Sequence, residues 1–304
     1  MLEVKELTIS FTQYQVGLRQ RDLKVITDLS LDVAPGEIVA IVGSSGSGKS
    51  LLAHAVLGIL PNNARVSGEL YFEGEKLEPK RQAALRGRRI ALIPQAVTFL
   101  DPLMRVGQQA RDIGSGEVGA ARQREVFARY GLAEHVDEMY PFQLSGGMLR
   151  RVLVSTAVLS GASLIIADEP TPGLDPAAVR ETLGHMRELA NDGRGVMLIT
   201  HDLMAARSVA DRVAVFYAGT TLEVAKSSAF SGDGEALLHP YSRGLWRAMP
   251  DCDFTPMPGA QPMPDNMPDG CVFEPRCPRA TPECAAAAPD PSAHDSSWVR
   301  CFHA

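Results

Sequence analysis

The feature that most constrains this chain is a glycine-rich stretch between two apolar runs. Its residues are Gly43, Ser44, Ser45, Gly46, Ser47, Gly48, Lys49 and Ser50. The run Ile38–Val42 before it predicts a buried strand, and Leu51–Leu57 after it predicts a helix. Such a loop surrounds phosphate oxygens with backbone N–H groups and a helix N-terminus. Lys49 is then expected to reach the terminal phosphates and Ser50 to bind Mg²⁺, so the chain is predicted to bind a nucleoside triphosphate.

Polar residues follow two further apolar runs. Asp168 and Glu169 come directly after Ser163–Ala167, and His201 follows Gly195–Ile199 shortly afterwards. In parallel α/β sheets, ligands bind at the carboxyl ends of the strands. Asp168 is therefore expected in the Mg²⁺ shell, and Glu169 is expected to polarise the water that attacks the γ-phosphate. His201 is expected to contact that phosphate, and Asp168 and Glu169 should point to opposite faces if both lie in a strand.

A second small-residue turn predicts another anion site. Ser145, Gly146 and Gly147 precede an apolar helix expected over Val152–Leu159, so their N–H groups lie at a helix N-terminus. Taken alone, this turn is more often a helix cap. Two aromatic residues before the glycine-rich stretch, Phe11 and Tyr14, could each stack on a purine ring or pack in a strand, and Phe11 is the preferred stacking residue.

Composition and charge exclude several classes of protein. The chain has 304 residues and a net charge of −6, which argues against a bulk electrostatic nucleic-acid binder. No apolar run approaches the length needed to cross a bilayer, and Met1–Leu7 lacks the order of a signal peptide. We therefore expect a cytosolic protein that reaches a membrane only through partners. All five cysteines lie between Cys252 and Cys301, which predicts a regular α/β body followed by an irregular tail.

Taken together, these stretches resemble the nucleotide-binding subunit of an ATP-binding cassette (ABC) transporter over residues 1 to about 225. The matching motifs occur in the family's order. They are Walker A at Gly43–Ser50, the Q-loop at Gln95, the signature at Leu144–Met148, Walker B at Leu164–Pro170, the D-loop at Gly173–Asp175 and the H-switch at His201. The resemblance implies an α/β P-loop fold with a mixed sheet core, an antiparallel β subdomain and an inserted helical subdomain at about residues 97–160. It places the ATP-binding domain at 1–235 and a small cysteine-bearing extension at 236–304.

The resemblance also assigns roles across a head-to-tail dimer. It implies that Ser145, Gly146 and Gly147 contact the γ-phosphate held by the other subunit's Walker A loop. It places Asp175 at the nucleotide as well. Gln95 would be both a catalytic residue and an Mg²⁺ ligand, and it would link the phosphate to the surface that docks the membrane subunits. ATP would then favour the closed dimer, and hydrolysis would release it.

The tail resembles the C-terminal extension of ATPases from peptide and nickel importers. The similar segments are His239–Ser242, Gly270–Pro278 and, after the Q-loop, Phe99–Leu103. The D-loop, Thr171–Asp175, departs from the sequence usual in peptide importers, which weakens the substrate assignment.

Four of the tail cysteines form a predicted metal site. Clustered thiols in a cytosolic chain favour a metal over disulfides, and four thiolates suit an iron–sulfur cluster. Members of the resembled group carry a [4Fe–4S] centre here. The predicted ligands are Cys271, Cys277, Cys284 and Cys301. Zinc and unligated thiols are the alternatives, His303 could replace Cys301 as a ligand, and Cys252 is expected to be a spectator.

The leading hypothesis is an ATP-hydrolysing subunit of an importer for peptides, nickel or a similar small solute. Its expected partners are a second, different ABC ATPase, two membrane-spanning permease subunits and, indirectly, an extracytoplasmic solute-binding protein. Its expected place is the cytoplasmic face of the inner membrane. A metal–metallophore importer shares this architecture. A soluble ABC ATPase acting on nucleic acid, and a regulatory cassette that binds ATP without turnover, are less favoured, because the chain has one cassette, an acidic balance and both Glu169 and His201.

Overall fold

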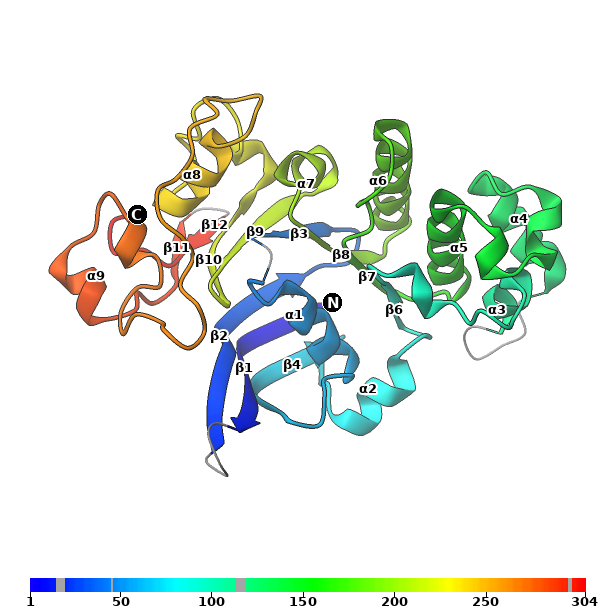
Figure 1. Ribbon diagram of the computed structural model, residues 1–304, viewed down its shortest axis with the longest axis horizontal. Helices are drawn as coiled ribbons and strands as arrows, with labels where there is room; N and C mark the ends of the chain where they lie inside the picture. Colours follow the sequence, from blue (N-terminus) through cyan, green and yellow to red (C-terminus); the bar gives the residue numbers. More distant parts are fainter. Residues whose placement is uncertain (15–19, 45, 113–118, 295–296) are drawn as a thin grey trace. The chain divides into compact units, whose positions relative to one another are not determined.

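The computed structural model describes residues 1–14, 20–44, 46–112, 119–294 and 297–304 (Figure 1). Its described residues form two compact units, each with its own core. The first unit comprises Met1, Val33–Ile38 and Leu77–Ile199, and the second comprises Leu2–Asp32, Val39–Lys76 and Thr200–Ala304.

Three parallel strands form the centre of the first unit. They are β6 (Ile90–Ile93), β7 (Leu164–Asp168) and β8 (Gly195–Thr200). Ala167 pairs with Ile93 on one side and with Leu198 on the other. Every residue of β7 and β8 is buried, as expected for strands covered on both faces.

Helices of the first unit include the predicted helical segment. α5 (Gly146–Leu159) packs against β6, and α3 (Val106–Arg111) and α4 (Ala120–Arg129) pack on α5. The unit also contains α2 (Pro79–Leu85), α6 (Pro176–Asn191) and the 3₁₀ turns η1 (Val97–Phe99), η2 (Glu134–Glu138) and η3 (Pro141–Gln143). α5 begins six residues before the expected Val152, because Ser145 caps it.

The second unit contains a mixed sheet. β3 (Ile38–Val42) pairs in parallel with β9 (Arg212–Tyr217), and β9 pairs antiparallel with β10 (Thr220–Lys226). The sequence predicts a hairpin of Val213–Tyr217 and Thr220–Val224 around Ala218 and Gly219. The structure confirms it, with φ angles of 48° and 81° at these two turn residues. Helices α1 (Lys49–Leu57) and α7 (Leu203–Val209) belong to this unit.

An antiparallel sheet completes the cassette in the second unit. Its order is β2 (Gln20–Val33), β1 (Leu2–Tyr14), β4 (Ala64–Phe72) and β5 (Glu75–Lys76). The sequence predicts two strands where β1 lies, Leu2–Lys5 and Leu7–Phe11. The structure instead has one long strand with a register shift between Lys5 and Thr8, where Glu6 takes a φ of 50°. A β-bulge bends a strand without ending it. The mixed sheet and antiparallel sheet predicted for an ABC ATPase are confirmed.

The tail is joined to the second unit by strand pairing. β12 (Ser297–Val299) pairs antiparallel with β10, and β11 (Ser292–His294) pairs with β12. Arg300 donates to the Asp28 carbonyl at 2.9 Å and forms an ion pair with the Asp28 carboxylate at 2.8 Å. The other tail elements are η4 (Ser227–Ala229), α8 (Pro240–Arg247), η5 (Glu274–Arg276) and α9 (Pro282–Ala286). Three-residue strands give too little periodicity to predict from sequence.

A buried polar junction fixes the start of the tail. The Glu223 carboxylate on β10 accepts the backbone N–H groups of Leu238 and His239 at 2.8 and 3.0 Å. His239 caps α8, because its Nδ1 accepts the Tyr241 N–H at 3.0 Å. Burial lowers the pKa of His239 to about 3. The ring is therefore neutral in the folded protein and acts as an acceptor.

This junction predicts a loss of stability in mild acid. The unfolded histidine, with a pKa near 6.5, binds a proton that folded His239 rejects, so stability should fall as pH drops from about 6.5 toward 3. By pH 5 this one group should cost about 2 kcal/mol of unfolding free energy. His239→Asn retains a capping acceptor and should flatten the difference in urea midpoint between pH 7 and pH 5. His135→Asn, at an exposed site, is the control that should retain it; equal pH dependence in wild type and His239→Asn would contradict the assignment.

Candidate nucleotide-binding site

The predicted phosphate loop has the expected strand–loop–helix form. β3 is buried throughout and α1 begins at Lys49, with Gly48 as its N-cap at a φ of 96°. That left-handed backbone favours glycine. Gly43 is required for a different reason: a Cβ there would lie 2.4 Å from the carbonyl oxygen of Phe216 on β9. The loop therefore requires glycine at Gly43 because β9 lies so close, and at Gly48 because the backbone is left-handed.

Lys49 lies over the loop that it was predicted to serve. Its Nζ donates to the carbonyls of Gly43 and Ser44 at 2.8 and 2.9 Å, and its side chain is buried. Ser47 is buried as well, and within the described residues its hydroxyl has no hydrogen-bond partner. A buried ammonium group and a buried hydroxyl available for bonding fit a phosphate ligand. Ser45 lies outside the described residues.

The residues predicted to act on the γ-phosphate come from both units. In the first unit, Asp168 is the last residue of β7, and Glu169 follows it. Both side chains are buried. The expectation that they alternate along a strand is wrong, because β7 ends at Asp168 and Glu169 has a φ of 47° while its N–H donates to Ile199 at 2.9 Å. A non-glycine residue in this conformation is uncommon and concentrates at functional sites.

In the second unit, Ser50 lies in the first turn of α1 and His201 is exposed between β8 and α7. The next residue, Asp202, caps α7 by accepting the Ala205 N–H at 2.9 Å. The hydroxyl of Ser50 and the carboxylate of Asp168 are hard oxygen donors, the kind that Mg²⁺ prefers. Their chemistry fits the predicted metal. The roles of Glu169 and His201 stay predictions.

Arg150 is a site residue whose role the sequence did not reveal. It lies on α5, in the turn after the signature, and its guanidinium donates to the carbonyls of Pro94 and Gln95 at 2.7 and 3.0 Å. Burial lowers the pKa of Arg150. The Q-loop is thus fastened to the signature helix by a buried cation, while the Gln95 side chain itself is exposed. The sequence signal that could have identified this residue is an arginine on an otherwise apolar face of the helix.

The signature and the D-loop line one cavity of about 300 Å³ in the first unit. Ser145 caps α5 by accepting the Met148 N–H at 3.3 Å, and Asp175 caps α6 by accepting the N–H groups of Ala177 and Ala178. Those two bonds lower the pKa of Asp175. The lining residues are Ser145, Gly147, Met148, Arg151, Gly173, Leu174, Asp175, Ala178 and Thr182. Two predicted contact segments therefore form one surface, with Asp175 holding its shape.

The predicted adenine-stacking residues lie on β1 in the second unit. Phe11 is half-buried and pairs with Ala64 across the sheet, whereas the Tyr14 side chain is 68% exposed. A ligand can therefore reach the ring of either residue. Stacking by Phe11 stays a prediction.

The structure gives no support to the predicted metal site in the tail. Within the part of the chain that is described, no group of three or more His, Cys, Asp or Glu side chains is arranged to hold a metal ion. Two of the cysteines are nevertheless neighbours, since the Cys271 N–H donates to the Cys284 carbonyl at 2.8 Å. Burial raises the pKa of the Cys271 thiol. Cys284 Sγ lies 3.5 Å from Nε2 of His303. All five cysteines are free thiols.

No helix among the described residues is long and apolar enough to span a membrane. Residues 26–172 match the family model for the ABC transporter, and residues 222–284 match the model for the oligopeptide/dipeptide transporter C-terminal region.

Curated relatives match over almost the whole chain. An oligopeptide transport ATP-binding protein, OppD, from Salmonella typhimurium is 34% identical over 99% of this chain and 93% of its own length. A dipeptide transport ATP-binding protein, DppD, from Haemophilus influenzae is 33% identical over 99% of this chain and 94% of its own length.

Among solved structures, the dimeric ATP-binding cassette MJ0796 bound to ADP and Pi superposes with a TM-score of 0.64 at 27% identity. It covers 75% of this chain and 99% of that cassette. The chain therefore belongs to the ABC transporter ATP-binding proteins of the oligopeptide/dipeptide importer type, which are ATPases.

Proposed function

We propose that this ATPase powers the import of short peptides. The observation that carries the proposal is the tail: residues 222–284 match a region defined by oligopeptide and dipeptide transporters, and relatives named for both substrates align along nearly the full chain. Nickel and metal–metallophore complexes remain the alternative solutes. A soluble ABC ATPase acting on nucleic acid is the alternative of another class.

The proposed chemistry assigns one task to each predicted site residue. Lys49 neutralises the terminal phosphates that the loop's N–H groups hold. Mg²⁺, which Ser50, Asp168 and Gln95 would hold, would supply charge stabilisation. Glu169 accepts a proton from the attacking water, because its buried carboxylate lies at the end of β7, next to Asp168. His201 donates a hydrogen bond to the γ-phosphate.

The proposed assembly contains two ATPase subunits arranged head to tail. The cavity lined by Ser145, Gly147 and Asp175 would face the nucleotide held by the other subunit. The dimeric structure of the cassette MJ0796 supports an assembly of two such subunits. We propose a second, related ATPase as the partner rather than a second copy.

Exposed apolar side chains after the Q-loop support docking to membrane subunits. Phe99 is 61% exposed and Leu103 is 86% exposed, and both follow Gln95, whose backbone carbonyl Arg150 fixes. Exposed large apolar groups in one short segment mark an interaction surface. We propose that two permease subunits bind here. The ATPase would then be peripheral, at the cytoplasmic face of the membrane, with a solute-binding protein acting on the far side.

Transport in proteoliposomes tests the proposal. The ATPase subunits and their permeases are reconstituted, and ATP-dependent uptake of labelled di-, tri- and pentapeptides is compared with uptake of nickel. Peptide uptake that requires ATP and the solute-binding protein is the expected result. ATP-dependent nickel uptake without peptide uptake would replace the peptide assignment. Hydrolysis stimulated by nucleic acid, with no permease association, would favour the soluble class.

We propose as well that the four tail thiols bind a [4Fe–4S] cluster. The support is the number of thiols in the tail, since four thiolates suit such a cluster. Protein purified without oxygen should contain about four irons and acid-labile sulfide per chain, and Cys277→Ser should lose the brown chromophore. Cys252→Ser is the control that should keep it. One zinc per chain would replace the cluster, and unchanged visible absorbance in Cys277→Ser would refute it.

A further inference from the structure

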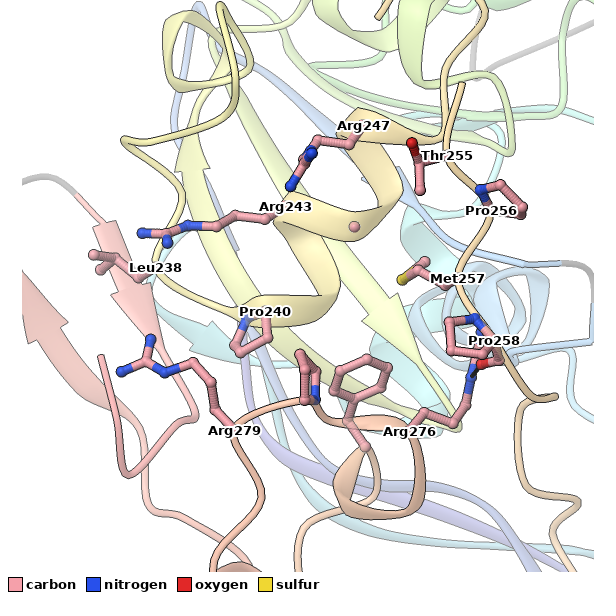
Figure 2. Close-up of a pocket in the computed structure, with 13 residues that line it drawn as sticks. Leu238, Pro240, Arg243, Arg247, Thr255, Pro256, Met257, Pro258, Arg276 and Arg279 are labelled. Carbon is pink, nitrogen blue, oxygen red and sulfur yellow. Dashed lines mark hydrogen bonds between the residues drawn. The ribbon is translucent and has the colours of Figure 1, made fainter. Parts of the chain in front are cut away.

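A second cavity lies entirely within the tail of the second unit, and none of the predicted site residues lines it. Its volume is about 340 Å³, which is within the range of small-molecule sites (Figure 2). Its apolar wall includes Met257, Phe273 and Pro240. Phe273 is buried and packs against Tyr217 and Tyr241, so this wall is rigid. The cavity is therefore a preformed apolar surface.

Four arginines surround this apolar wall. Arg243 and Arg247 come from α8, and Arg276 and Arg279 come from η5 and the loop after it (Figure 2). Such a concentration of positive charge is unusual in a chain whose net charge is −6. It favours an anionic ligand.

Most of these charges are held in place by neutral acceptors. Arg243 Nε donates to the Leu237 carbonyl at 2.6 Å, Arg276 Nε to the Pro258 carbonyl at 2.8 Å, and Arg279 to the His303 carbonyl at 2.7 Å. Further N–H groups of Arg243 and Arg276 donate to the Glu235 carbonyl and the Tyr217 hydroxyl. In the described part of the chain, Arg247 is the one member of the four that forms an ion pair, with Asp253. Neutral acceptors orient a guanidinium group without cancelling its charge.

We propose that this cavity binds an organic anion that has a carboxylate head and an apolar body. Guanidinium groups pair with carboxylates through two parallel bonds, and the wall of Met257 and Phe273 would cover the apolar part. A short peptide with a free C-terminus and a long-chain carboxylic acid both have this chemistry. The site is independent of the transport proposal.

Calorimetric titration with matched probes tests the site. The probes are decanoate and its methyl ester, and the dipeptide leucyl-leucine and its C-terminal amide. At least one carboxylate should bind with a Kd below about 1 mM. The Kd of its ester or amide should be at least about tenfold higher. Tighter binding of decanoate identifies the acid, and tighter binding of the dipeptide identifies the peptide. No saturable binding of either carboxylate, or equal binding of the esterified and amidated forms, overturns the proposal.

Variants at the rim give an independent test. Arg247→Gln with Arg279→Gln removes two exposed charges and should weaken carboxylate binding about tenfold or more. Arg65→Gln, an exposed arginine on β4, is the matched control and should bind as wild type does. Arg279→Gln alone is the milder variant if the double variant folds poorly. Wild-type affinity in a folded rim variant overturns the proposal.

A separate contact connects this region to the phosphate loop. Pro258 lines the cavity, and three residues later the Gln261 side chain accepts a hydrogen bond from the Ser44 hydroxyl at 2.6 Å. The Asp265 carbonyl accepts from Arg21 at 3.1 Å, so the segment is fastened on both sides of Gln261. We further infer that a ligand in the cavity changes nucleotide affinity through Gln261. This second inference rests on the proposed nucleotide site.

The connection is tested by measuring the Kd of a non-hydrolysable ATP analogue with and without the carboxylate. A change of about threefold or more is expected in wild type, and Gln261→Ala should abolish it without weakening carboxylate binding. By linkage, the analogue should change carboxylate affinity by the same factor. An unchanged nucleotide Kd overturns the connection. Failure to bind the analogue without any carboxylate would instead contradict the nucleotide site, so the two failures are distinguishable.

Discussion

Glu169→Gln should lower the rate of ATP hydrolysis by about 100-fold or more and leave Mg·ATP affinity unchanged. Glutamine has nearly the same shape as glutamate but cannot accept the proton of the attacking water. The left-handed backbone conformation and the buried position of residue 169 are compatible with either side chain. The loss should therefore be in kcat, with little change in KM.

Steady-state phosphate release and equilibrium nucleotide binding together check this prediction. Glu125→Gln, at an exposed helix position that pairs with Arg122, is the matched control and should keep both values. Wild-type hydrolysis in Glu169→Gln would remove Glu169 from the mechanism. A loss of nucleotide binding equal to the loss of turnover would assign the residue to binding instead.

Gly43→Ala should destabilise the protein by about 2–3 kcal/mol and weaken nucleotide binding. The new methyl group would lie 2.4 Å from the Phe216 carbonyl oxygen and 3.1 Å from the Phe216 Cβ. The carbonyl belongs to β9, whose residues pair with β3, so it cannot move without disturbing that pairing. The loop must shift instead, and with it the two carbonyls that Lys49 contacts.

Gly184→Ala is the matched control for that substitution. Gly184 lies exposed within α6, and an added Cβ meets nothing within 4 Å. There alanine should stabilise the helix by up to about 1 kcal/mol. Urea unfolding of both variants and titration with ATP check the pair. If Gly43→Ala keeps wild-type stability and affinity, the close approach of the loop to β9 does not restrict this position.

Predictions from the sequence were reliable where a motif and the strands or helix beside it lie in one continuous segment. Gly43–Ser50 lies between a buried strand and a helix, as predicted, and the turn at Ala218 and Gly219 joins two strands. Predictions weakened where the structure depends on distant partners. The bulge at Glu6, which arises in the pairing of β1 with β4, joins two expected strands into one. The early start of α5 was a local signal that the prediction missed, because Ser145 directly precedes the helix and caps it.

The cysteine cluster shows a different limit. Clustering in the sequence suggested that four thiols would share a metal, yet the part of the chain that is described holds no group arranged to bind one. Whether gathered thiols can hold a metal depends on the distances and directions of their sulfur atoms, which spacing does not determine. Substrate identity is harder still, because the nucleotide motifs carry no information about a transported solute.

The sequence by itself determined the family, the ATPase activity and the order of the nucleotide motifs. Each motif is a short continuous segment, so its residues can be recognised without knowing which distant parts of the chain they contact. Only the tertiary structure decided which distant segments touch. It placed Arg150 on the Q-loop carbonyls, paired β12 with β10, and brought Gln261 to Ser44. It also gathered four arginines from α8 and the tail around one cavity. Such contacts join residues that are tens to hundreds of positions apart, and no local periodicity records them.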